Sequence, residues 1–372
     1  MTQSLMSGIS GLQNFQERMD VIGNNIANVN TSGFKAGRTV MTDSFSNTLQ
    51  SATGSSGVQV GTGVATNSIQ NMFTQGSLAS TGKNTDLAIS GDGFFMVKDP
   101  LSAASFATRA GEFDLSNEGY LVMGGMRLQG YMDEALKTVG DLKVDAKDRI
   151  AANLATANQA LTDATSAKAT AATAYTTANT AYEAARADYT TKQKAADDAP
   201  TDDAAKAAAL EAKTALATAQ TALDGATATK TATETAFTVA TAKAAAAVKA
   251  GVERWNVDDS GKINIFLSDG TSFVRGQVLL QNFRNPQALT KDGNNLYSNL
   301  DAAGPVTGST NTLAAPGTYG MGGVKGGQLE LANVDLTNEF SSMITTQRAF
   351  QAAARIVTTT DEILQELINL KR

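Results

Sequence analysis

The residues of this chain that could do chemistry are carboxylates, hydroxyls and lysines, because its 372 residues include neither cysteine nor histidine. Without cysteine the chain has no disulfide, no thiolate nucleophile and no sulfur-ligated metal. Without histidine it lacks the side chain that most often transfers protons near neutral pH, which is also the commonest metal ligand. We find no Ser, Lys, Asp or Glu residues spaced as a catalytic constellation, so the sequence predicts a protein that is not an enzyme.

Two short segments have the composition of binding sites but not the spacing. Val60-Gly-Thr-Gly-Val64 lacks the lysine of a Walker motif and the third glycine of a dinucleotide fingerprint, so a tight turn is the better interpretation. The acidic run Asp197, Asp198, Asp202 and Asp203 lacks the loop spacing of a known calcium site. We interpret these aspartates as solvated charges at the tip of a helical hairpin, and the sequence predicts neither a cofactor nor a metal.

Composition argues against two further classes of protein. The formal net charge is −6 and the isoelectric point is near 4.9, whereas a nucleic-acid-binding protein needs a basic face. No run of about 18 apolar residues is present, so no membrane insertion is expected. The first eight residues lack the basic region and the apolar stretch of a cleavable signal peptide. If the protein is exported, we expect a route that does not read such a signal.

The sequence predicts a long helix at each end of the chain, and these two helices are the elements most able to carry a functional surface. Over residues 3–30, apolar side chains recur at steps of three and four. They are Leu5, Ile9, Leu12, Met19, Ile22, Ile26 and Val29. The last forty residues or so show the same spacing. The apolar residues there are Leu336, Phe340, Met343, Phe350, Ala354, Val357, Leu364 and Ile368. A second apolar line beside them consists of Ile356, Ile363, Leu367 and Leu370. Thr337 precedes Glu339 and is the expected cap region.

Both stripes repeat like heptads, and the C-terminal one is wider than a two-helix contact requires. One interpretation makes them ordinary core helices of a single globular domain. The other pairs them as a coiled coil whose remaining apolar face drives polymerisation. Periodicity alone does not distinguish the two.

The predicted fold class is α+β, elongated and multidomain. An inner coiled-coil axial domain is expected to combine residues 1–34 with 334–372. A β-rich domain combines 35–137 with 256–333, where short alternating runs are separated by turns. Its clearest hairpin has alternating isoleucines from Ile263, an Asp269-Gly270 turn and a return strand from Phe273.

Residues 142–252 are rich in alanine and threonine, and a disordered insert is the simplest alternative for such composition. Heptad spacing on both sides of Pro200 favours instead a long antiparallel helical hairpin with its tip near 197–203. About fifty residues per arm would make a projection of roughly 75 Å. Folding about Pro200 places Tyr175 close to Gly225 and Lys168 near Lys230.

Several motifs resemble those of one known family. The segment GNNIANVNTSGFK resembles the N-terminal signature of bacterial flagellar axial proteins of the rod and hook type, and it contains Asn24, Asn25, Asn28, Gly33, Phe34 and Lys35. Residues 332–340 and 346–351 resemble the closing motif of that family and include Gln347 and Arg348. Segments 86–95, 109–113, 282–286 and 293–297 are similar to its core motifs.

The resemblance implies a structural subunit that polymerises with itself into a hollow tube. The paired terminal helices would line the tube, and the β-rich domain would form the next shell. Such subunits are exported through the flagellar type III apparatus and assemble beneath a hook cap. Their neighbours are the distal rod and the hook–filament junction proteins. An extracellular hook of this kind is a flexible universal joint that transmits torque from rod to filament.

Within the family, the hook interpretation is favoured over the distal rod. A rod turns inside closely fitting rings, where a long projection on every subunit would clash. The alanine-rich insertion departs from the β-rich outer domains usual in hooks, so the family pattern does not assign it a role. A further alternative is an axial protein whose hairpin serves as a surface-adhesion or sheath-binding module.

Overall fold

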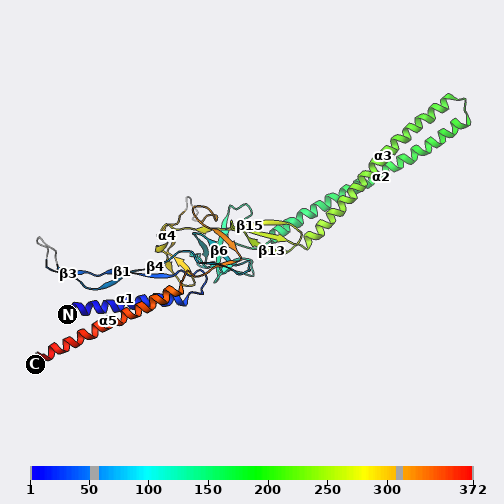
Figure 1. Cartoon of the computed structure of the whole chain (residues 1–372). Helices are drawn as coiled ribbons and strands as arrows, with labels where there is room; N and C mark the ends of the chain where they lie inside the picture. The colour runs from blue at the N-terminus through cyan, green and yellow to red at the C-terminus, as the bar shows by residue number, and fades with distance from the viewer. Residues whose placement is uncertain (1, 51–57, 307–312, 371–372) are drawn as a thin grey trace. The chain divides into compact units, whose positions relative to one another are not determined.

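The computed structural model describes residues 2–50, 58–306 and 313–370. Positions 1, 371 and 372 of the predicted axial domain and positions 51–57 and 307–312 of the predicted β-rich domain lie outside the described residues. The chain forms two compact units, and together their helices and strands confirm the α+β class (Figure 1). Unit 1 comprises Met1–Asp145, Trp255–Ile265 and Phe273–Arg372, and unit 2 comprises Ala146–Arg254 and Phe266–Ser272.

The two ends of the chain form long helices that lie side by side in unit 1 (Figure 1). Helix α1 spans Thr2–Ala27 and helix α5 spans Leu336–Leu370. The short helix α4, Leu300–Ala303, and the 3-10 turn η1, Pro286–Ala288, are also in unit 1. None of the helices in the described ranges is long and apolar enough to cross a membrane.

Helix α1 ends at Ala27, although the predicted apolar stripe continues to Val29. The Asn28 side-chain amide donates to the Asn24 carbonyl at 2.9 Å, and its Oδ1 accepts the Thr31 hydroxyl at 3.2 Å. These local bonds compete with continuation of the helix, as asparagine side chains commonly do. The helix therefore stops at Ala27, and the placement of Val29 on its apolar stripe is wrong because Val29 lies in the turn that follows.

The start of α5 also differs from the prediction. The backbone N–H groups of Thr337 and Asn338 donate to the Asp335 carboxylate at 2.9 and 3.3 Å. Asp335 is therefore the capping residue, and the assignment of this role to the Thr337 region is wrong. A carboxylate suits this position because the N-terminus of a helix carries partial positive charge.

Between these helices the chain forms twenty strands in the described ranges. Those before unit 2 are β1 Gly37–Asp43, β2 Ser46–Gln50, β3 Val58–Gly61, β4 Val64–Asn71, β5 Leu78–Ser80, β6 Leu87–Ser90, β7 Phe94–Lys98, β8 Ser105–Thr108, β9 Asp114–Leu115, β10 Leu121–Met123, β11 Met126–Tyr131 and β12 Val139–Asp141. The later ones are β13 Val252–Val257, β14 Lys262–Leu267, β15 Ser272–Val278, β16 Leu280–Gln281, β17 Thr290–Lys291, β18 Leu296–Ser298, β19 Gly323–Gly326 and β20 Gln328–Glu330.

The largest sheet has twelve strands. Its main path runs β13-β14-β15-β11-β7-β8-β18-β17, and β9, β10, β12 and β16 pair beside it. Four further two-stranded sheets pair β1 with β4, β2 with β3, β6 with β19 and β5 with β20. The last two join strands from the two halves of the chain, so the β-rich part depends on contacts between residues far apart in sequence.

One of the two predicted turns is confirmed. The tight turn expected at Val60–Val64 is wrong, because the backbone continues from β3 into β4 and pairs there with Ser44 and Phe45, although Gly63 has a φ of +132°. Gly270 has a φ of +82° between β14 and β15, and buried and half-buried residues alternate along β14. Both glycines adopt backbone angles that residues with a Cβ rarely tolerate.

The core of unit 1 is centred on strand β7, whose first four residues are buried. Because adjacent residues of a strand point to opposite faces, Phe94 and Phe95 supply two aromatic contacts. Phe94 packs edge-to-face on Phe283 at 5.5 Å between ring centroids, and Phe95 packs on Phe113 at 5.5 Å. Burial raises the pKa of Tyr297, which packs on Phe94 in the same cluster.

Unit 2 consists mainly of two long helices that lie side by side, α2 over Lys147–Asp198 and α3 over Asp203–Val248 (Figure 1). Their buried positions are all alanines: Ala171 and Ala196 on α2, and Ala209, Ala212, Ala240, Ala244 and Ala247 on α3. The Asp202 carboxylate caps α3 by accepting the backbone N–H groups of Ala204 and Ala205. Each alanine buries little area, so this helix pair depends on close approach along its length.

The register of the two helices differs from the prediction. The Lys230 ammonium lies 4.4 Å from the centroid of the Tyr175 ring, and the Lys168 ammonium lies 4.6 Å from that of Phe237. The expected pairing of Tyr175 with Gly225 is wrong, because a Cβ at Gly225 would meet nothing within 4 Å. The expected lysine–lysine layer is wrong too, since each ammonium lies instead on a ring face, where attraction replaces repulsion.

Candidate assembly surface

Helices α1 and α5 pack through small and polar residues. The buried positions on α1 are Gly8, Gly11, Asn14, Ile22 and Asn25, and those on α5 are Thr346, Ala353 and Thr360, spaced by seven. A Cβ added to Gly8 would lie 3.0 Å from Cγ2 of Val357, so the two backbones approach closely there. The heptad spacing predicted for these helices is present, but small residues occupy its buried line.

The predicted packing residues mostly lie beside this buried line. Ile22 is buried and Ile9 is exposed, while the half-buried residues on α1 are Leu5, Leu12, Met19 and Ile26. On α5, Phe340 and Ile368 are exposed, and the half-buried residues are Met343, Phe350, Val357 and Leu364. Contact between α1 and α5 therefore covers only part of the apolar stripe of each helix.

Ten large apolar side chains remain exposed along the two helices, on more than one side of α5. We call this set the axial face, and it consists of Met6, Ile9, Leu336, Phe340, Ile344, Ile356, Ile363, Leu367, Ile368 and Leu370, each at least 39% exposed. Monomeric proteins rarely expose so many large apolar side chains in one region, and such patches mark interaction surfaces. The axial face is the candidate functional site of this chain.

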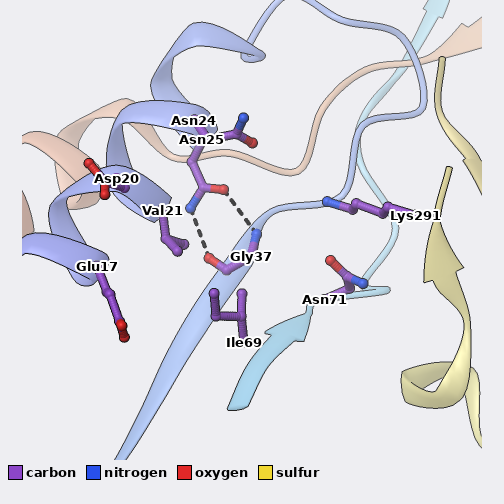
Figure 2. Close-up of a pocket in the computed structure, with 9 residues that line it drawn as sticks. All are labelled: Glu17, Asp20, Val21, Asn24, Asn25, Gly37, Ile69, Asn71 and Lys291. Carbon is purple, nitrogen blue, oxygen red and sulfur yellow. Dashed lines mark hydrogen bonds between the residues drawn. The ribbon is translucent and has the colours of Figure 1, made fainter. Parts of the chain in front are cut away.

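Asn25 joins this helix pair to the β-rich part of unit 1 (Figure 2). Its side-chain amide donates to the Gly37 carbonyl and accepts the Gly37 N–H, both at 2.9 Å, and donates to Glu339 Oε1 at 3.1 Å. These bonds tie α1 to the start of β1 and to the first turn of α5. Beside them is a cavity of about 370 Å³, and Glu17 and Asp20 of α1 are among its lining residues (Figure 2).

Asn14 makes a second junction that the sequence analysis missed. Its Nδ2 donates to the carbonyls of Ser10 and Val64 at 2.7 and 2.9 Å, and its Oδ1 accepts the Thr66 hydroxyl at 2.6 Å. Asn14 thereby fixes β4 against α1. The sequence held little signal for this role, because Asn14 lies outside the apolar stripe, on the line of small and polar residues with Gly8 and Gly11.

Lys35, the last residue of the N-terminal motif, belongs to a buried ion cluster. Its ammonium lies 2.6 Å from Oε1 of Glu330, and the Arg109 guanidinium lies 3.2 Å from Oε2 of the same carboxylate. All three side chains are at most 3% exposed. Glu330 also accepts the Gly76 N–H at 2.9 Å, and Lys35 donates to the Thr74 carbonyl at 2.8 Å.

One carboxylate in this cluster therefore serves two cations. Burial lowers the pKa of Lys35, and the neighbouring carboxylate of Glu330 partly offsets that effect. Lys35 and the segment containing Arg109 belong to the motifs found in the sequence, but Glu330 was not predicted. Strand β20 has the sequence Gln-Leu-Glu, so nothing in its local composition marks Glu330 as buried.

The other motif residues fall into two groups. Gly33 has a φ of +68°, and an added Cβ would lie 2.4 Å from the Ala110 nitrogen, so this close approach requires glycine. Phe34 is buried beneath the Lys291 ammonium, which lies 4.7 Å from its ring centroid and whose pKa is lowered by burial. By contrast, the structure leaves Asn24, Gln347 and Arg348 exposed.

The described parts of the chain contain no group of three or more acidic side chains that could hold a metal ion. Of the residues that the sequence pattern and the family motifs singled out, Ile9, Phe340 and Ile368 belong to the axial face. Asn25, Gly33 and Lys35 lie at junctions between the helices and the β-rich part. The axial face can therefore bind a partner by burying apolar side chains. The buried ion cluster of Lys35, Glu330 and Arg109 holds the ends of the two helices in position.

We predict that Glu330→Gln destabilises unit 1 by about 3–5 kcal/mol, because it leaves two buried cations without a counter-charge. Trp255, the single tryptophan, lies in unit 1 and reports its unfolding in urea. The control is Glu118→Gln, which removes an exposed partner of Arg127 and is expected to cost less than about 1 kcal/mol. Equal unfolding midpoints for the two variants would contradict the role assigned to the cluster.

Comparison with known proteins locates three family models along the chain. The model described as flagella basal body rod protein matches residues 5–35, and that of the flagellar hook protein FlgE/F/G D1 domain matches 88–159. The model of the flagellar basal body rod FlgEFG protein C-terminal region matches 325–370. The first and last matches cover α1 with the Lys35 motif and α5 with Glu330.

Full-length relatives agree with these matches. The flagellar hook proteins FlgE of Borreliella burgdorferi and Treponema pallidum are each 31% identical, and the alignments cover the whole of both chains. The flagellar basal-body rod protein FlgG of Bacillus subtilis is 30% identical, again over the whole of both chains. With terminal helices, an exposed axial face and motif residues at its junctions, this chain belongs to the family of flagellar hook and rod proteins.

Proposed function

We propose that this chain is a structural subunit of the bacterial flagellar hook, without enzymatic activity, that polymerises into a hollow, flexible tube. The observation that carries this proposal is the axial face. Its large apolar side chains are exposed although the helices beneath them are already paired, so a second copy is the partner that fits them. Hook relatives matched over their full length support the hook assignment.

In this proposal the terminal helices, residues 1–34 and 334–372, form a coiled coil that lines the tube. The β-rich ranges 35–137 and 256–333 form the next layer. The subunit would reach this place through the flagellar type III export apparatus and would meet the hook cap, the distal rod and the hook–filament junction proteins. Torque would then pass from the rod through the tube to the filament.

The distal rod is the second candidate function. It is supported by the rod protein relative, whose identity to this chain is close to that of the hook relatives. Expressing the chain in a strain without its hook protein and in one without its distal rod protein separates the two. Restored hooks support the proposal, and restored rods with no hooks would replace it.

We predict that the double variant Ile356→Ser, Ile363→Ser raises the critical concentration for polymerisation about a hundredfold. Both side chains are about half exposed in the single chain, at 48% and 52%. Without the burial of these two side chains between subunits, the free energy of association should be less favourable by roughly 3 kcal/mol in total. Sedimentation of polymer from monomer measures this change.

The matched control is Leu210→Ser, which removes an apolar side chain that is 66% exposed on α3 in unit 2. It should leave both the critical concentration and the unfolding of the monomer unchanged. If the isoleucine variant polymerises like the wild type, the axial face is not the assembly surface.

We further propose that unit 2 is an accessory module that polymerisation does not require, which leaves it available for the hook surface. Its buried residues are alanines, and the axial face lies entirely in unit 1. The residues to remove are those of the two helices themselves. Leu142 and Val144 must stay, because they are buried in unit 1 although the insertion is predicted to begin at residue 142.

We predict that replacing residues 147–248 by a short glycine–serine linker leaves polymerisation within about twofold of the wild type, since such a linker closes the gap at little entropic cost. Electron microscopy of hooks from cells that express this variant provides the readout. Normal hooks together with lost binding to cell surfaces or sheath material would favour the adhesion role. Absence of hooks would make unit 2 part of the assembly.

A further inference from the structure

Asp86 has a buried carboxylate, one oxygen of which, Oδ1, lacks a hydrogen-bond partner in the described part of the chain, and the nearest cation acting on it is the exposed Lys83. The residue precedes β6 and is 4% exposed, and its Oδ1 accepts no hydrogen bond there. Its backbone is bonded to Lys83 and Gly327, but through main-chain atoms only. Burying an ionised carboxylate costs several kcal/mol unless a cation or donors compensate it, so this group calls for a partner.

Asp86 lines a cavity of about 640 Å³ in unit 1. The other charged residues of the lining are Glu112, Asp114 and Lys83. The Lys83 ammonium already lies 2.9 Å from Asp114 Oδ1, whereas Glu112 is exposed and makes no ion pair among the described residues. With three carboxylates and one ammonium the cavity carries two net negative charges, and Asp86 and Glu112 face each other across an antiparallel bridge.

The remaining lining suits a cation with an aliphatic stem. Leu329 and Met123 supply apolar surface, and Thr31, Ser32 and Thr81 supply hydroxyl groups. Arginine and lysine combine a charged head with a methylene stem that packs on apolar atoms. Calcium, in contrast, takes about six to eight oxygen ligands, commonly with several carboxylates, and the described residues include no acidic group of three or more that could hold a metal.

We infer that this cavity receives an arginine or lysine side chain of a second copy of the chain, which pairs with Asp86 and Glu112. The inference rests on the proposed polymerisation, since it requires neighbouring copies. The chain offers cations for this role: Lys137 and Arg284 are exposed in unit 1, and neither forms an ion pair in the described ranges. This contact is separate from the axial face, so it would hold the β-rich parts of adjacent subunits together by charge.

The test is Asp86→Asn in the full-length protein, which keeps the side-chain volume and removes the charge. We expect the critical concentration for polymerisation to rise about tenfold or more, because a desolvated charge pair loses one partner. The urea midpoint of the monomer, followed by Trp255 fluorescence, should stay the same or rise, since a buried charge without a partner has been removed. Asp301→Asn, an exposed aspartate outside the cavity lining, is the control and should change neither value.

Three results would overturn the inference. Wild-type polymerisation by Asp86→Asn would show that no partner charge binds there, whereas failure of the wild type itself to polymerise would refute the proposed function instead. A less stable Asp86→Asn monomer would make Asp86 an internal counter-charge. Calorimetric titration with calcium chloride alone should show no binding, and micromolar binding lost in Asp86→Asn would make the cavity a metal site.

Discussion

The geometry of unit 1 depends on one buried carboxylate that holds two cations. Glu330 is six residues before α5, and Lys35 is eight residues after the end of α1. Their ion pair therefore fixes the points at which both terminal helices leave the β-rich part, and Arg109 anchors this junction to the end of β8. Breaking a buried ion pair destabilises a protein strongly, because the charge that remains is buried without a partner and without solvation by water. The cluster is thus a constraint on position more than a source of net stability.

The contact between the terminal helices has the opposite character. Gly8, Gly11 and Ala353 bury little area, so α1 and α5 approach closely while several of their large apolar residues stay exposed. A helix pair that buried all its leucines and isoleucines internally would leave nothing for a neighbour. The small-residue line therefore leaves the axial face uncovered. Asn14 bonds α1 to β4 and Asn25 bonds it to α5, so hydrogen bonds as well as apolar burial hold these elements in place.

Much of this architecture could be predicted from local sequence. Apolar periodicity located both terminal helices, Asp269-Gly270 located a hairpin, and Pro200 located the break between α2 and α3. Features that depend on contacts distant in sequence could not be predicted in this way. Glu330 pairs with Lys35 across 295 positions, and the cation–π contacts of Lys168 and Lys230 shift the register of α2 on α3. Periodicity identifies apolar positions on a helix, but not which of them a partner covers.

The central claim is that the axial face is buried between copies of this chain in a tube. Helical reconstruction by cryo-electron microscopy of polymer formed by the full-length protein tests it most directly. The account predicts that Phe340, Ile356 and Ile363 contact neighbouring subunits in the innermost layer. A polymer in which these side chains face solvent, with subunits joined only through other surfaces, would contradict it.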